Sequence, residues 1–214
     1  MALSKINTGG LAADAVDNTI LDLADNFAFT GTVTGAGGTP GLVHLSTSTL
    51  ASDATEVVFN SLINTSTYTN YKIHAQGHTS ADANVRAVFR DSSNADINTS
   101  GLYRGRIART ANIADSSYIT LLGGSVGYNG TEETGFILDI NLNLINQGST
   151  TSIMPQLQGI TQFVQNNGNP LVQHIGYTMR PSVATTAVAG IRFYPASGNF
   201  KAGSKFVLYG LAES

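Results

Sequence analysis

The sequence contains no cysteine and no tryptophan, and only 12% of its 214 residues are Asp, Glu, Lys or Arg. The lack of cysteine excludes disulfide cross-links and thiolate-bound metals. No stretch approaches the roughly 20 consecutive apolar residues that a bilayer-spanning helix needs. The first residues, MALSKINTGGLAADAVD, also lack the apolar core of a signal peptide. We therefore expect a soluble protein that is made in a cytoplasm and does not bind a membrane.

The low charge content bears on the partners of the protein. The formal net charge is −3 and Lys and Arg form no cluster, so we expect no contact with nucleic acid. An average soluble domain carries about 25% charged residues, and here Ser, Thr, Asn and Gly take their place. A weakly charged surface is poorly protected against self-association. We expect much of the surface to be covered by copies of the same chain.

Strand signals recur from Leu42 onward, with turn residues between them and no long helical pattern. The sequence predicts strands at 42–48, 55–59, 70–77, 84–90, 101–108, 117–124, 136–145, 152–165, 170–179, 188–195 and 205–211. Many short strands at close intervals are typical of a β-sandwich or barrel. For this number of strands in one domain, 42–214, we predict an antiparallel jelly-roll β-sandwich.

The clearest strand signal is FILDINLNLI at 136–145. Apolar residues at every second position alternate with mostly polar ones, which is the pattern of a half-buried antiparallel strand. The side chains expected in the core are Phe136, Leu138, Ile140, Leu142 and Leu144. Near the end of the chain, KFVLYGL follows turn residues that include Gly198 and Gly203. An apolar run so close to a terminus predicts a strand that is paired inside a sheet and closes the core.

Residues 1–41 differ from the remainder and are interpreted as an extended N-terminal arm. Asp and Asn recur in LAADAVDNTILDLADNF without a lasting helical stripe, and GAGGTPG at 35–41 has the composition of a flexible linker. The arm has too few apolar residues to fold alone, so they need a partner surface. The expected attachment residues are Ile20, Leu21, Leu23, Phe27 and Phe29.

Two groups of residues could hold a metal ion. His74 and His78 are four residues apart with Asp82 nearby, but Gly77 is expected to end the strand, and ordinary partly buried histidines are the simpler interpretation. The segment 91–98, which carries Asp91, Asn94, Asp96 and Asn98, offers oxygen ligands for calcium. It lacks the glycine and the distal glutamate of an EF-hand loop, and Asp and Asn are also common turn residues.

Signals of catalysis are weak. Glu132 and Glu133 are adjacent, so on a strand they would point to opposite faces rather than converge on one substrate. GAGGTPG is not followed by the Lys-Ser/Thr pair of a phosphate-binding loop, and no G-x-S-x-G motif is present. We therefore expect no enzymatic activity and no cofactor.

Both ends of the chain resemble a known class of proteins. The opening LSKINTGGLAADAVDNTILDLADNFAFTGTVTG resembles the N-terminal segment of structural and tail-fibre proteins of tailed bacteriophages, especially marine phages and cyanophages. The ending ASGNFKAGSKFVLYGLAES resembles the last strand of their jelly-roll domains, and GHTSADANVRAVFRDSSNADINTSGLY is similar to their strand pairs. The shared motifs are compositional, and the long repetitive shaft of such fibres is missing.

The resemblance implies a homotrimeric virion protein, assembled in the host cytoplasm, whose arm binds capsid or tail proteins and whose jelly roll is displayed outside. The missing shaft leaves a short tail appendage and a capsid decoration protein as alternatives. A carbohydrate-binding module for host glycans is a second hypothesis, for which Tyr103, Tyr128 and Tyr177 are candidate exposed aromatics. A tyrosine on a strand, however, more often belongs to the core or to an interface. A polysaccharide depolymerase is a third, although a carboxylate cluster is missing.

Overall fold

The computed structural model describes residues 41–64, 67–107, 114–122, 135–144, 154–164, 169–180 and 187–212. Every regular element in these ranges is a β-strand, which confirms the all-β prediction. The strands are β1 (Leu42–Thr49), β2 (Val57–Phe59), β3 (Asn70–Gly77), β4 (Val85–Arg90), β5 (Tyr103–Ile107), β6 (Ala114–Ser116), β7 (Ile119–Thr120), β8 (Phe136–Asn143), β9 (Gln156–Val164), β10 (Pro170–Met179), β11 (Gly190–Pro195) and β12 (Lys205–Leu211). The predicted arm, with Ile20, Leu21, Leu23, Phe27 and Phe29, lies outside the described residues.

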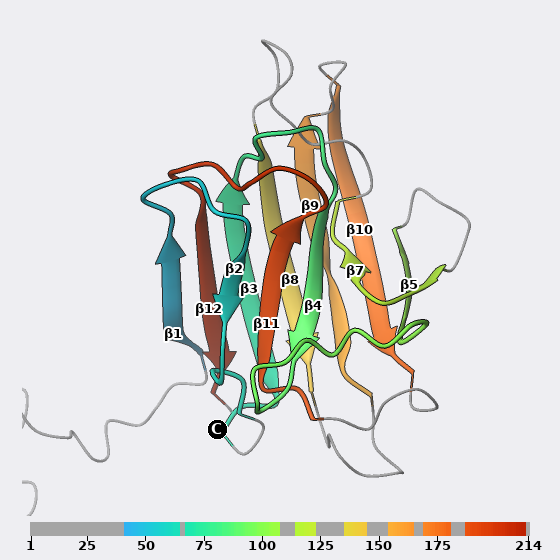
Figure 1. Ribbon diagram of the computed structural model, residues 1–214. Coiled ribbons are helices and arrows are strands. Elements are labelled where there is room, and N and C mark those ends of the chain that lie inside the picture. Colours follow the sequence, from blue (N-terminus) through green and yellow to red (C-terminus); the bar gives the residue numbers. More distant parts are fainter. Residues whose placement is uncertain are drawn as a thin grey trace, which may run out of the picture. The chain divides into compact units, whose positions relative to one another are not determined.

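The strands form two antiparallel sheets within one compact unit, Thr39–Ser214 (Figure 1). The larger sheet has eight strands in the order β1-β12-β3-β8-β9-β10-β5-β6, and the smaller has four in the order β2-β11-β4-β7. The first four strands alternate between the sheets. The two last strands return to the beginning of the domain, since β12 pairs with β1 and β3 while β11 pairs with β2 and β4.

The register of β8 follows the prediction made from its alternating sequence. The side chains of Phe136, Leu138, Ile140, Leu142 and Leu144 are each at most 3% exposed. Asp139, Asn141 and Asn143 lie on the opposite side of the strand, which we call the outer side because it faces away from the other sheet. Successive side chains of a strand point to opposite faces, so one local pattern determines the register of the whole strand.

The C-terminal strand β12 lies inside the larger sheet, between β1 and β3, as its apolar run predicted. Phe206 and Leu208 are fully buried, and Val207 is only 6% exposed although it lies on the outer side. The turn before β12 contains Gly203, whose φ of 87° is in the left-handed region that glycine adopts without strain. The end of the chain therefore contributes to the core.

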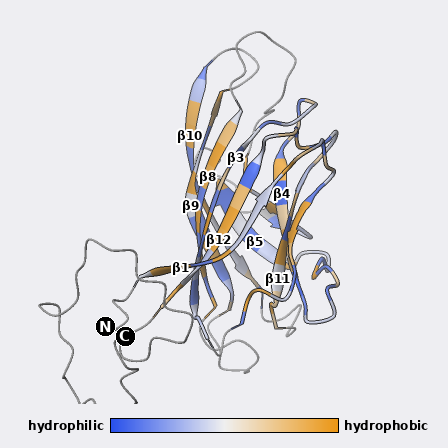
Figure 2. Ribbon diagram, turned by 90° about the vertical axis from the view of Figure 1, so that its left-hand side faces the viewer, coloured by the Kyte–Doolittle hydropathy of each residue, from blue (hydrophilic) through white to orange (hydrophobic). Residues whose placement is uncertain are grey.

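Aromatic side chains from both sheets meet in the core. Phe206 of β12 lies 5.3 Å from Phe193 of β11 and 5.1 Å from Phe200, measured between ring centroids. The Phe136 ring of β8 lies beside the rings of Phe200 and Phe206. Figure 2 shows the two layers from their side, with β3, β8 and β9 in one layer and β4 and β11 in the other. One continuous apolar core therefore holds the two sheets together.

Local sequence patterns did not predict the extent of every strand or the burial of every loop residue. Of the described residues in the predicted strand 117–124, only Ile119–Thr120 belong to a strand, and the fully buried Leu121 and Leu122 follow it. Most residues of the polar segment 91–101 are exposed, but one of them belongs to the core. Ile97 is 6% exposed, and its carbonyl accepts a 2.6 Å hydrogen bond from the Tyr103 hydroxyl, which also accepts one from the Phe89 N–H.

Candidate interaction face

The outer side of the eight-stranded sheet is the candidate functional surface. Six large apolar side chains of the described residues are exposed, and five of them lie on this side of strands β1, β12, β8, β9 and β10. They are Leu42 (52% exposed), Ile137 (44%), Ile160 (46%), Val172 (58%) and Leu211 (37%). The sixth, Val43, alternates with Leu42 and so points to the other side of β1. Exposed apolar groups gathered on one face are typical of an interaction site.

Cross-strand register brings three of these side chains together as the β8–β10 patch, defined as Ile137, Ile160 and Val172. Gln162 of β9 pairs with Ile137 on one side and with Val172 on the other. Ile160 lies two residues before Gln162, on the same side of β9, so it is a diagonal neighbour of both. Sequence analysis did not single out these residues. The available signal was Ile137, an apolar residue on the otherwise polar side of β8.

A second group, the β1–β12 patch, consists of Leu42, Tyr209 and Leu211. Leu42 pairs directly with Leu211 at the end of the two strands. Tyr209 is on the same side of β12, and its ring meets the His44 ring edge-on at a centroid distance of 5.9 Å. Mostly polar side chains lie between the two patches, among them the charged Lys72, Asp139 and Lys205.

Amides dominate the outer side between the patches. Strands β3, β8 and β9 place seven of them there: Asn70, Gln76, Asn141, Asn143, Gln156, Gln158 and Gln162. The two charges among them compensate each other, because Lys72 Nζ lies 2.9 Å from Asp139 Oδ1. Each amide is both a donor and an acceptor, so this region can form hydrogen bonds without gaining or losing charge.

Two shallow hollows indent this region. One has a volume of about 300 Å³ and is lined mainly by amides, together with Lys72 and the apolar pair Leu42 and Leu211. The other has a volume of about 400 Å³ and lies beside Ile137 and Ile160. Side chains of a bound molecule could therefore insert into the face.

The β5–β6 end of the same sheet has a different character. Asp115 accepts two hydrogen bonds from Arg104, at 2.8 and 2.9 Å, and a third from Arg180 at 3.0 Å. The hydrogen bond and charge of Arg104 hold the pKa of the Asp115 carboxyl below its ordinary value. Arg104, Asp115 and Arg180 are therefore paired with one another, and Arg106 of β5 adds an exposed positive charge, so this end marks the border of the less charged face.

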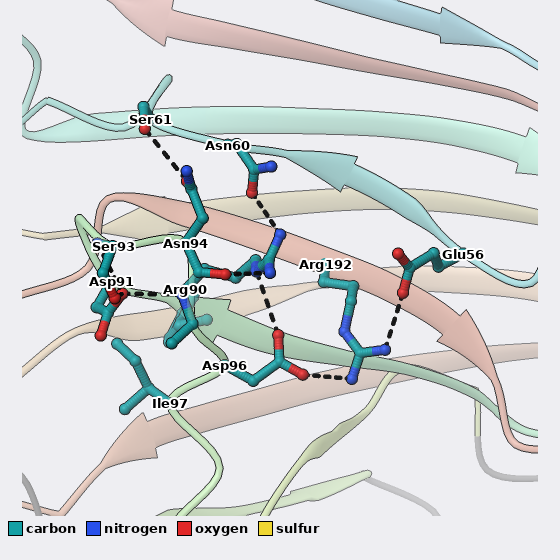
Figure 3. Close-up of polar contacts among 12 residues, drawn as sticks. Glu56, Asn60, Ser61, Arg90, Asp91, Ser93, Asn94, Asp96, Ile97 and Arg192 are labelled. Atoms are coloured by element: carbon teal, nitrogen blue, oxygen red, sulfur yellow. Dashed lines mark hydrogen bonds and ion pairs between the residues drawn. The ribbon is translucent and has the colours of Figure 1, made fainter.

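The outer side of the smaller sheet carries an ion-pair network (Figure 3). Arg192 of β11 lies 3.0 Å from Glu56 and 2.5 Å from Asp96, and Arg90 of β4 contacts the other Asp96 oxygen at 3.2 Å. Arg90 also donates to the Asn60 side chain and to the Asn94 carbonyl. The network links the segment after β4 to the smaller sheet, and its charged side chains pair with one another.

The same segment bears on the calcium hypothesis. Asp91 Oδ1 accepts hydrogen bonds from Ser93 N, Ser93 Oγ and Ala95 N at 2.9, 2.6 and 2.9 Å. These bonds, that of the Ser93 hydroxyl first, lower the pKa of Asp91. Asp96 is bound by two arginines. The carboxylates that were candidate calcium ligands therefore have partners within the protein.

The other candidate residues are scattered. His74 lies on the outer side of β3 opposite Asp139, whereas His78 follows the strand and lies beside Gly135. In the described ranges no three His, Cys, Asp or Glu residues form a group that could hold a metal. Glu132, Glu133, Tyr128 and most of the GAGGTPG linker lie outside the described residues.

Tyr103 and Tyr177 belong to the core, as the alternative interpretation of strand tyrosines held, and are not exposed aromatics. Tyr103 is fully buried and Tyr177 is 8% exposed, because both alternate onto the core side of their strands. Burial raises the pKa of both phenols. Neither can stack on a sugar from solvent.

Comparisons of the chain with protein-family models, with curated proteins and with solved structures found no match. In the described part of the chain, no helix has the length and apolar character needed to cross a membrane.

Proposed function

We propose that the described strands form a jelly roll whose larger sheet is extended at one side. The eight core strands are β1, β12, β3 and β8 in one sheet and β2, β11, β4 and β7 in the other. Each sheet receives a late strand between two early ones, which is the winding of paired Greek keys. Strands β9, β10, β5 and β6 then continue the larger sheet beyond β8.

We infer that the protein is a non-enzymatic structural component of a tailed-phage particle, a short tail appendage or a capsid decoration protein. In this proposal the N-terminal arm binds capsid or tail proteins and the jelly roll is displayed as a homotrimer. The sequence resemblance supports the phage assignment. The observation that carries the self-association is the concentration of five exposed apolar side chains on one weakly charged face.

The magnitude of apolar burial indicates how large the contact between subunits must be. Covering the part of the five side chains that is still exposed would contribute roughly 4–7 kcal/mol. Association of two proteins costs about 4–15 kcal/mol in lost translational and rotational freedom. The five side chains alone barely offset this cost, so a stable trimer requires contacts over most of the face, including the amides.

The proposal is tested by assembly rather than by activity. Light scattering on the full chain should give a mass three times that of one subunit. A variant that lacks residues 1–38 keeps Gly41, whose carbonyl accepts the Ala212 N–H, and keeps the whole compact unit. We expect this variant to remain trimeric and to be missing from phage particles. Normal incorporation of the variant would show that the arm is not the attachment element.

Antibody labelling of particles in micrographs tests the location. Hundreds of copies over the head would indicate a decoration protein, and a handful at the tail would indicate an appendage. Particles without label, in a preparation where the full chain is expressed, would contradict the virion assignment.

A carbohydrate-binding module is the second candidate, and the 300 Å³ hollow with its amide lining favours it. Amides can satisfy sugar hydroxyls. If neutral host glycans bind there, Asn141→Ala and Gln158→Ala should each weaken binding measured by calorimetry. A trimer that covers this face would leave the hollow closed, so glycan binding by the intact trimer would place the subunit contact elsewhere.

A further inference from the structure

We propose that the outer side of the eight-stranded sheet binds an acidic polysaccharide, one that carries carboxylate groups. The amide-lined hollow holds sugar hydroxyls, and Arg106 and Lys205 bind the carboxylates. This inference rests on the carbohydrate-binding candidate function and distinguishes an acidic ligand from a neutral one.

The charges on this side are mainly positive. Its strands carry two carboxylates, Asp115 and Asp139, and Arg180 contacts the first of these from the end of β10. The cations on the strands themselves are Lys72, Arg104, Arg106 and Lys205. The resulting excess of three positive charges contrasts with the formal net charge of −3 of the whole chain. A face with charge of one sign attracts a ligand of the opposite sign.

Two of these cations are available to a ligand. The other three each contact a carboxylate of the protein. Arg106 and Lys205 are exposed, and neither forms an ion pair with another residue that the structure describes. The planar fork of an arginine matches a carboxylate with two N–H donors, so Arg106 is suited to the acidic group of a sugar.

Cross-strand register connects Arg106 to the hollow. The last strand that lines the 300 Å³ hollow is β9, where Gln158 pairs with Gly176 of β10, and Gly176 pairs with Arg106 of β5. Gly176 has no side chain, and a Cβ placed there would meet no atom within 4 Å. The surface is therefore open from the hollow to Arg106, over two strand spacings or roughly 10 Å.

The uncharged groups between the two cations favour a sugar chain over a nucleic acid. Lys205 and Arg106 lie five strand positions apart, roughly 24 Å, so a ligand that reaches both is an oligomer. Between them, Asn141 and Gln158 line the hollow, and no side-chain hydrogen bond to another described residue occupies them. Their donors and acceptors suit hydroxyl groups. A nucleic acid, with a phosphate on every nucleotide, is bound by clustered Lys and Arg.

Calorimetry with a matched pair of ligands tests the charge class. Oligogalacturonate and its methyl ester differ only in the charge of the carboxyl groups. We expect the full chain to bind the acidic oligomer at least about tenfold more tightly, and this preference should shrink at high salt because the charges are exposed. Equal affinities would overturn the acidic ligand and leave the carbohydrate-binding function standing. Binding of neither oligomer would overturn both.

Substitutions of single cations locate the contact. Arg106→Gln and Lys205→Gln should each weaken binding of the acidic oligomer about three- to tenfold and leave binding of the ester unchanged. The control Lys201→Gln removes a positive charge from the segment before β12, where Lys201 contacts Asp53, and should leave both affinities unchanged. Circular dichroism checks that all three variants fold.

Two outcomes of this comparison would overturn the site. An equal loss in all three variants would show that only the net charge of the protein matters. Single-stranded DNA that binds more tightly than the acidic oligomer, and that loses affinity in the Arg106→Gln and Lys205→Gln variants, would make nucleic acid the ligand of this face.

Discussion

The outer sides of the two sheets carry different kinds of side chains. On the smaller sheet, Arg90 and Arg192 share Asp96, and nearby Asn60 and Glu56 complete the network. On the larger sheet, strands β1, β12, β3, β8, β9 and β10 contain no arginine at all. Their outer side presents amides and aliphatic groups instead. The charged groups of the first face pair with one another, whereas the second face exposes five large apolar side chains.

On the smaller sheet, two arginine side chains also lie over tyrosine rings. The Arg192 guanidinium lies 4.4 Å from the Tyr194 ring centroid, and that of Arg86 lies 4.0 Å from the Tyr118 ring centroid. These contacts cover part of the smaller sheet with its own side chains.

The largest expected effect separates the inner and outer sides of the larger sheet. Leu142→Ala should lower the free energy of unfolding by about 2–5 kcal/mol, because it removes a buried side chain from the core. Asn141→Ala, one residue away on the outer side, should cost about 0.5 kcal/mol or less in the isolated subunit. Urea unfolding measures both. Similar losses for the two variants would mean that the outer side is already packed within one subunit.

A smaller effect distinguishes the ion pairs of the two faces. Arg192→Ala removes the partner of Glu56 and one partner of Asp96, and should cost about 1–3 kcal/mol. Lys72→Ala on the larger sheet removes an exposed pair with Asp139, and should cost about 0–1 kcal/mol. Thermal unfolding of both variants at low and high salt measures the difference. A larger cost for Lys72→Ala would reverse the comparison.

The smallest expected effect is a change in acid stability at the β5–β6 border. Arg104 lowers the pKa of Asp115 in the folded protein, so the unfolded chain binds a proton more readily. This contribution is present above the ordinary pKa of about 4 and is lost as the pH falls through the lowered folded value. Asp115→Asn should therefore reduce the slope of stability against pH below about pH 4. Asp53 and Asp91, whose pKa values are also lowered, are unchanged in this variant, so their part of the slope should remain.

Much of the fold was predictable from local patterns. Period-two alternation identified β8 and its buried side, since the pleat of a strand sends successive side chains to opposite faces. The apolar run at Phe206–Tyr209 identified a final strand inside a sheet, because unpaired backbone groups cannot be buried. The candidate site was harder. Ile137 stood out on the polar side of its strand, but nothing local linked it to Ile160 or Val172.

The sequence by itself determined the strand content, the register of β8 and the shortage of charge, which all follow from neighbouring residues. Only the tertiary structure decided that Tyr103 and Tyr177 are buried and that the exposed aliphatic residues of β8, β9 and β10 lie together. It also decided that Glu56 and Asp96 meet Arg192, residues separated by long stretches of chain. The physical reason is that sheet order and cross-strand pairing depend on how all strands pack around one core, and local alternation carries no information about which strands become neighbours.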